Sequence, residues 1–89
     1  SMGDLAVPVF RVRVEVWLKE GLVDAEGETV KEALRDLGYD VSGTRVGKVY
    51  QFAVKAVDRG EAERLVEEIC RRLLANPVKD KYFFEVWDG

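Results

Sequence analysis

Residue types that could do chemistry are sparse in this sequence. It contains no histidine, so Ser-His-Asp triads, Cys-His dyads and imidazole metal sites cannot form within one chain. Its one cysteine, Cys70, borders an apolar helical stripe, which predicts a buried and unreactive thiol. The carboxylate pairs Asp36/Asp40 and Glu67/Glu68 fall on charged helical surfaces, where acidic side chains are ordinarily solvated. These residues indicate no active site, and we expect no catalytic residue and no metal site.

Nucleotide and nucleic-acid binding are disfavoured as well. The glycines form neither a GxGxxG motif nor a phosphate-binding P-loop. Segment 47–54 (GKVYQFAV) resembles the RNP1 strand of RNA-recognition domains, but Tyr50 and Phe52 share a face with Val54 and Ala56, which is typical of a core. The 17 acidic residues outnumber the 14 basic ones, whereas nucleic-acid binders usually carry a basic surplus.

Length and composition limit the number of domains and the class of protein. The 89 residues, 47% hydrophobic and 35% charged, suit one globular domain. Ser1 before Met2 is typical of a cloning remnant, so we expect residues 1–8 to be a tag remnant and flexible N-terminus, and residues 9–89 to be one domain. We see neither a signal peptide nor an apolar run of about 18 residues, and we expect no membrane partner and a cytoplasmic location.

The spacing of hydrophobic residues predicts the strands and helices that would position any site. Residues 10–19 alternate almost perfectly, which predicts a half-buried strand. Asp24 is a good helix N-cap, and Val30, Ala33, Leu34 and Leu37 then mark one helical face. Glycine lowers the stability of a helix relative to alanine, so its presence at position 27, near the helix start, suggests that another segment approaches its backbone.

The second half of the chain repeats this order. Residues 41–57 predict two strands, with a turn near Gly47-Lys48 or, alternatively, at Ser42-Gly43 with one long strand after it. Asp58 and Glu61 have capping-box spacing before a second amphipathic helix, and residues 82–87 alternate as a last strand. We therefore predict an α+β, ferredoxin-like βαββαβ sandwich, an antiparallel sheet with two helices on one face.

The other face of this sheet would be bare. If the even-numbered residues of the first strand face the helices, Trp17 points away from them, and by the same logic so do Phe83 and Trp87 on the last strand. A clustered aromatic patch on a small domain usually marks an interface. We expect these three residues to form an oligomer interface; the alternative is local packing against a terminal segment such as residues 5–9.

Four ordered blocks of the sequence resemble one known family. They are residues 14–27 (VEVWLKEGLVDAEG), residues 30–39 (VKEALRDLGY), residues 44–48 (TRVGK), and residues 73–78 (LLANPV) with the closing Tyr82 and Glu85-Val86. The family is PurS, the small subunit of phosphoribosylformylglycinamidine synthase. This sequence differs from the family pattern at Ala25-Glu26, where the family has Pro-Gln. The loss of proline removes a rigid first helical turn.

The resemblance implies a non-catalytic subunit in the fourth step of purine synthesis. Such a subunit joins a large synthetase subunit (PurL) to a glutaminase subunit (PurQ) and supports the transfer of ammonia between them. It holds no cofactor of its own, since ATP and Mg are used by the synthetase subunit. It would also form a homodimer or homotetramer. The alternative function is a small-molecule-sensing ACT-like module, or another ferredoxin-like binding module.

The resemblance also suggests where partners bind. We expect the contacts to be made by the matching loop, turn and cap residues: Asp24, Gly27, Arg45, Gly47, Lys48 and Asn76. Each of them has an ordinary structural explanation too, because Asp caps helices, glycine shapes turns and Asn-Pro ends helices.

Overall fold

Three strands and two helices make up the fold of residues 7–89, which are the residues that the computed structural model describes. The first six residues of the expected flexible N-terminus lie outside this range. The elements are β1 (Val9–Leu18), α2 (Ala25–Asp36), β2 (Lys48–Lys55), α3 (Arg59–Ile69), the single π-helical turn η1 (Cys70–Leu74) and β3 (Asp80–Asp88). Within residues 7–89, no helix is long and apolar enough to cross a membrane.

The strands form one antiparallel sheet in the order β2-β1-β3. The central strand β1 pairs Val14 with Tyr50 of β2 and with Phe84 of β3. Its even-numbered side chains from Phe10 to Val16 are buried, Val14 completely and Val12 almost so, as the alternating pattern predicts. The core therefore lies on one face of the sheet.

Helix α3 covers this face, and it begins as the capping-box spacing predicts. The Asp58 carboxylate accepts a hydrogen bond from the Glu61 backbone N–H (2.8 Å), while the Glu61 carboxylate accepts one from the Val57 N–H (3.3 Å). Ala62 and Val66 are fully buried against the sheet. The π-helical turn η1 continues the helix, which keeps Cys70 in the same buried stripe.

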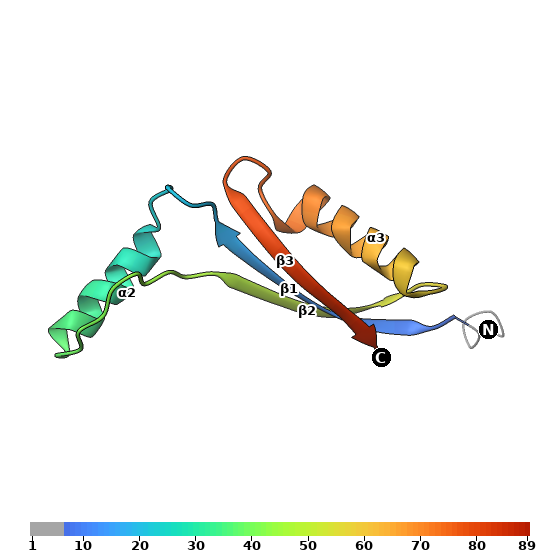
Figure 1. Cartoon of the computed structure of the whole chain (residues 1–89), viewed down its shortest axis with the longest axis horizontal. Coiled ribbons are helices and arrows are strands. Elements are labelled where there is room, and N and C mark those ends of the chain that lie inside the picture. Colours follow the sequence, from blue (N-terminus) through green and yellow to red (C-terminus); the bar gives the residue numbers. More distant parts are fainter. Residues whose placement is uncertain (1–6) are drawn as a thin grey trace.

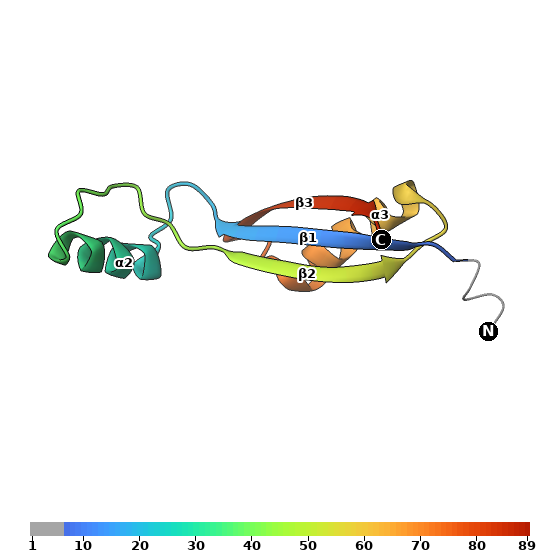
Figure 2. The same cartoon turned by 90° about the horizontal axis from the view of Figure 1, so that it is seen from below.

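Helix α2 does not cover the sheet. Figures 1 and 2 show it beyond the end of the sheet, on an arm built from two extended connections and the helix. The described chain measures 58 × 27 × 17 Å with a radius of gyration of 17.6 Å, whereas a compact domain of this size has about 12 Å. The α+β class and the ferredoxin-like antiparallel arrangement are confirmed, but the expectation that both helices of one chain cover one face is wrong.

The expected strand at the start of segment 41–57 is also absent from the described residues. Only residues 48–55 are paired in the sheet, and residues 41–47 run beside α2 as an irregular connection, here called the strap. The strap leaves the sheet with α2, so none of the strands in residues 7–89 lies beside it (Figure 2). A turn between two strands near Gly47-Lys48 is therefore wrong; the chain does bend at Gly43, with φ at 63°, and one strand follows, but it begins only at Lys48.

Candidate partner-binding site

Asp24 connects the start of α2 to the end of the strap. Its Oδ1 accepts a hydrogen bond from the Gly27 backbone N–H (2.9 Å), as expected of an N-cap. Its Oδ2 accepts a second one from the Val46 N–H (2.8 Å), which the sequence did not predict. These two backbone donors, that of Gly27 first, hold the pKa of Asp24 below its ordinary value. The carboxylate thus ties together two segments that are far apart in the sequence.

Gly27 lets the strap lie directly against the helix. The residue is buried, and a Cβ atom placed on it would lie 2.6 Å from the Thr44 carbonyl oxygen. No side chain fits in that space. The expectation that another segment approaches the backbone of Gly27 is confirmed, and the segment is the strap.

Arg45 anchors the strap to the end of β1. Its Nη2 donates to the Leu18 carbonyl oxygen (2.6 Å), and its Nη1 donates to Oε2 of Glu20 (2.9 Å). The other Glu20 oxygen accepts from Lys81 at the start of β3. Lys81 first, and then Arg45, hold the pKa of Glu20 below its ordinary value. The Arg45 guanidinium is therefore engaged within the chain.

Gly47 and Trp17 complete the base of the arm. A Cβ atom on Gly47 would lie 2.7 Å from the Trp17 ring, so the indole packs on the glycine backbone. The indole Nε1 also donates to Glu15 (3.2 Å). The next residue, Lys48, is exposed, and its backbone pairs with Val16 in the sheet.

Asn76 shapes the turn that enters β3. Its Oδ1 accepts from the N–H groups of Val78 (2.9 Å) and Lys79 (3.0 Å), a common side-chain-to-backbone turn. The turn is joined to the end of β1, because the Lys19 backbone N–H donates to the Lys79 carbonyl oxygen (2.8 Å). Asn76 thus lies at the same end of the sheet as the arm.

The six predicted contact residues therefore gather at one end of the sheet, although they come from three distant segments. We call this region the joint, defined as Trp17, Glu20, Asp24, Gly27, Arg45, Gly47, Lys48, Asn76 and Lys81. Sequence reasoning missed Glu20 and Lys81, and it missed the role of Trp17 against Gly47. The missing information was strand register, since the pairing of β1 with β3 is what brings Lys81 beside residues 17–20.

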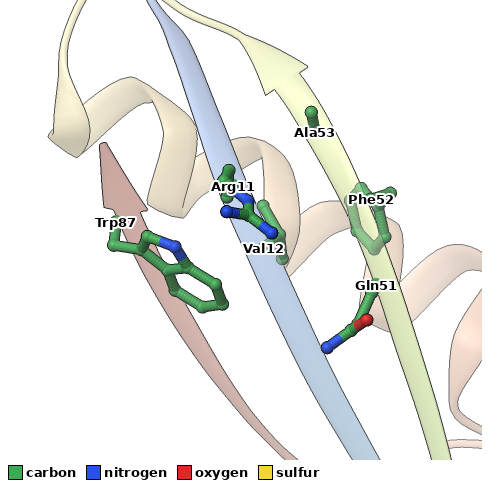
Figure 3. A pocket seen from close by; sticks show the side chains of 6 residues that line it. All are labelled: Arg11, Val12, Gln51, Phe52, Ala53 and Trp87. Carbon is green, nitrogen blue, oxygen red and sulfur yellow. The ribbon is translucent and has the colours of Figure 1, made fainter. Parts of the chain in front are cut away.

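The bare face of the sheet carries the three predicted aromatic residues. The register places Trp87 opposite Arg11 and Phe83 opposite Glu15, so both share a face with Trp17. The Arg11 guanidinium lies 5.8 Å from the centre of the Trp87 ring, within the range of a cation–π contact, and Figure 3 shows the two side chains beside a shallow groove with Gln51. Phe83 is 59% exposed.

The cysteine of the chain lies away from these surfaces. Cys70 is completely buried, and burial is the main cause that raises the pKa of its thiol. No three His, Cys, Asp or Glu side chains of the described residues are grouped so that they could hold a metal ion.

Known proteins match this chain over most of its length. The family model described as "PurS: Phosphoribosylformylglycinamidine (FGAM) synthase" matches residues 11–88. A relative from Archaeoglobus fulgidus, named phosphoribosylformylglycinamidine synthase subunit PurS, is 47% identical over 75 residues, which is 83% of this chain and 92% of that protein.

Solved structures agree with the sequence match. The purS subunit of phosphoribosylformylglycinamidine synthase from Thermotoga maritima superimposes with a TM-score of 0.85 at 30% identity, covering 91% of this chain and 94% of that one. A chain in a structure described as PurLQS from the same organism gives 0.84 at 31% identity, covering 90% and 99%. The chain therefore belongs to the PurS family, the small subunits of FGAM synthase in purine biosynthesis.

Proposed function

We propose that this chain joins the large synthetase subunit (PurL) to the glutaminase subunit (PurQ) and supports the passage of ammonia between them. The observation that carries the proposal is the likeness to a chain in the PurLQS structure of Thermotoga maritima. A surface held in a fixed shape by the joint suits a subunit that contributes geometry to its partners. We expect this assembly in the cytoplasm.

The chemistry of the reaction explains why such a subunit is useful. Glutamine hydrolysis releases ammonia in one subunit, and an amide activated by ATP consumes it in another. Ammonia that escapes into water is protonated and lost as a nucleophile, so the junction between the two sites must exclude bulk water. In this proposal ATP and Mg remain with the synthetase subunit, and this chain binds no cofactor.

The joint is our candidate for the contact with these partners. Because Asp24, Arg45 and Asn76 already bond within the chain, they shape the surface rather than offer free hydrogen-bonding groups. Lys48 is exposed at the base of the arm and supplies the charge that a partner would meet. Gly27 and Gly47 permit the close packing that this shape requires.

The bare face is our candidate for self-association into a homodimer or homotetramer. Trp17 is used in local packing against Gly47, while Trp87 and the exposed Phe83 remain available at the surface. Burying such aromatic side chains is a usual source of interface stability. Phe83→Glu should therefore lower the molecular mass of the largest assembly in sedimentation, whereas Glu63→Gln, on the outer side of α3, should leave it unchanged.

A binding experiment tests the partner role of the joint. Immobilised chain should capture PurL and PurQ together, and Lys48→Ala should weaken that capture more than Lys55→Ala at the other end of β2. Arg45→Ala should weaken it as well, because the strap loses its anchor to Leu18. Undiminished capture by both joint variants would reject the joint as the contact.

A further inference from the structure

A shallow groove crosses the bare face of the sheet at the end away from the joint. All three strands contribute to its lining, and we call it the sheet groove: Arg11, Val12, Gln51, Phe52, Ala53 and Trp87. The register sets Ala53 and Trp87 on either side of Arg11, so the small alanine leaves a hollow beside the tall indole. The hollow measures about 220 Å³, which is less than the pocket of a drug-sized ligand and suits a single planar ring system.

The Arg11 guanidinium is available to bind an anion. The residue is exposed, and within residues 7–89 its one recorded partner is the Trp87 ring. The neighbouring Arg13, in contrast, is paired with the Glu15 carboxylate. Arg11 therefore places an un-neutralised positive charge in the groove.

The Trp87 ring gives the groove a flat aromatic wall. The residue is only partly buried, and the Arg11 guanidinium lies 5.8 Å from the ring centre, near the outer limit of a cation–π contact. Because the long arginine side chain can turn aside without losing another bond among the described residues, a second ring can stack on the indole with the guanidinium at its edge.

Gln51 supplies a hydrogen-bond donor and an acceptor at the other wall. It is exposed, and Figure 3 shows its side chain pointing from β2 toward β1, on the opposite side of the groove from Trp87. A carboxamide pairs in a bidentate manner with the N6 donor and the N7 acceptor of adenine, whereas guanine presents two acceptors along that edge. The groove thus combines a stacking surface, an adenine-reading group and a cation.

The charge of the bare face also favours an anion. The charged side chains of its strands are four cations and two carboxylates: Arg11, Arg13, Lys55 and Lys81, with Glu15 and Glu85. The chain as a whole has a net charge of -3. The positive excess is therefore local to this face and opposite in sign to that of the protein.

We propose that the sheet groove binds a free adenosine phosphate. The adenine ring stacks on Trp87, the Gln51 carboxamide pairs with its N6 and N7 edge, and the Arg11 guanidinium binds the phosphate, whose oxygens match the planar guanidinium. The sequence contains no glycine-rich phosphate loop, so side chains of the strands take that part. The site adds a ligand-sensing function to the joining function proposed above and does not rest on it.

Single-stranded nucleic acid would present the same chemistry, but the surroundings favour the free nucleotide. The groove has room for one ring system. The next aromatic side chain along β3 is Phe83, which lies opposite Glu15, and that carboxylate would repel a phosphate backbone. The net negative charge of the chain also works against binding a polyanion.

Titration of the purified full-length chain with AMP tests the site. AMP should quench the indole fluorescence saturably, GMP and adenosine should bind more weakly, and inorganic phosphate should cause no quenching. Arg11→Gln should lower the affinity for AMP to that for adenosine, whereas Arg64→Gln, which removes an exposed arginine of α3, should leave it unchanged. Gln51→Leu should abolish the preference for AMP over GMP.

Calorimetry extends the test to the stacking residue, whose loss removes the fluorescent reporter. Trp87→Leu should weaken AMP binding about tenfold, as the loss of base stacking usually does. Phe83→Leu, which removes an exposed aromatic side chain on the same face outside the groove, should bind AMP like the wild type.

Three results would overturn the assignment. The first is the absence of saturable AMP binding at millimolar concentration. The second is AMP binding that survives both Arg11→Gln and Trp87→Leu, which would place the nucleotide elsewhere. The third is a single-stranded oligoadenylate that binds more tightly than AMP and with steep salt dependence, which would assign the face to nucleic acid. None of these measurements needs PurL or PurQ, so the joining role is tested separately.

Discussion

The carboxylate of Asp24 accepts a hydrogen bond from the backbone N–H of Val46, 22 residues further along the chain. The same carboxylate caps α2 through Gly27, so one side chain fixes both the start of the helix and the end of the strap. The arm therefore leaves the sheet in a defined direction. Because the joint gathers the six residues that we expect to contact partners, its geometry underlies the proposed function.

The first prediction concerns the stability of this connection. Asp58→Ala removes an ordinary helix cap at α3 and should cost about 1 kcal/mol of unfolding free energy. Asp24→Ala should cost more, because it leaves two backbone donors without their acceptor and one of them lies on a distant segment. Urea denaturation of the two variants makes the comparison. An equal or smaller loss for Asp24→Ala would mean that the bond to Val46 contributes nothing.

Acid should weaken the same connection. The pKa of Asp24 is lowered from its ordinary value of 3.8 by its two backbone donors, so its stabilising contribution is complete above that value and is lost as pH falls through the lowered pKa. Asp24→Asn lacks this titration. The stability difference between wild type and Asp24→Asn should therefore be constant near neutral pH and shrink below pH 3.8. A difference that stays constant down to strongly acidic pH would contradict the assigned hydrogen bonds.

Gly27 offers a steric test. Gly27→Ala places a Cβ atom 2.6 Å from the Thr44 carbonyl oxygen and should destabilise the chain by about 1–3 kcal/mol, as overpacking usually does. Gly60→Ala, near the start of α3, is the matched control, since the closest atom is Oδ1 of Asp58 at 3.5 Å, an ordinary van der Waals contact. Alanine there should be neutral or should stabilise by up to about 1 kcal/mol. Thermal unfolding that ranks the two variants in the opposite order would show that the strap does not press on α2.

The burial of Cys70 predicts its reactivity. The thiol is completely buried, and its pKa is raised by burial first and by the charge of Glu67 second. It should therefore react with a thiol reagent only at the rate at which the chain opens, and promptly once the chain is unfolded in denaturant. Rapid modification of the native protein would mean that α3 and η1 do not cover the sheet as described.

Local elements could be predicted from the sequence because local patterns define them. The alternation along β1, the caps at Asp24 and Asp58, and the close approach at Gly27 each follow from a few neighbouring residues, and the structure confirms all of them. The placement of Trp17, Phe83 and Trp87 on one face followed from the same alternation, and it is confirmed by the strand register.

The position of α2 could not be predicted in this way. Its apolar stripe shows that one side must be covered, but an identical stripe results whether its own sheet or another molecule covers it. The sequence predicts a strand at the start of residues 41–57, yet a strand requires a neighbour, and the arm carries residues 41–47 away from one. The ion pairs of Glu20 with Arg45 and Lys81 depend on register between distant segments, which composition and periodicity do not encode.

Reconstitution with purified PurL and PurQ tests the central claim most directly. Turnover of formylglycinamide ribonucleotide is measured with glutamine and, separately, with added ammonia, in the presence and absence of this chain. We predict that the chain alone has no activity, that it raises glutamine-dependent turnover, and that it leaves ammonia-dependent turnover nearly unchanged. Equal glutamine-dependent turnover without the chain, or turnover by the chain alone, would contradict a role in joining the two partners.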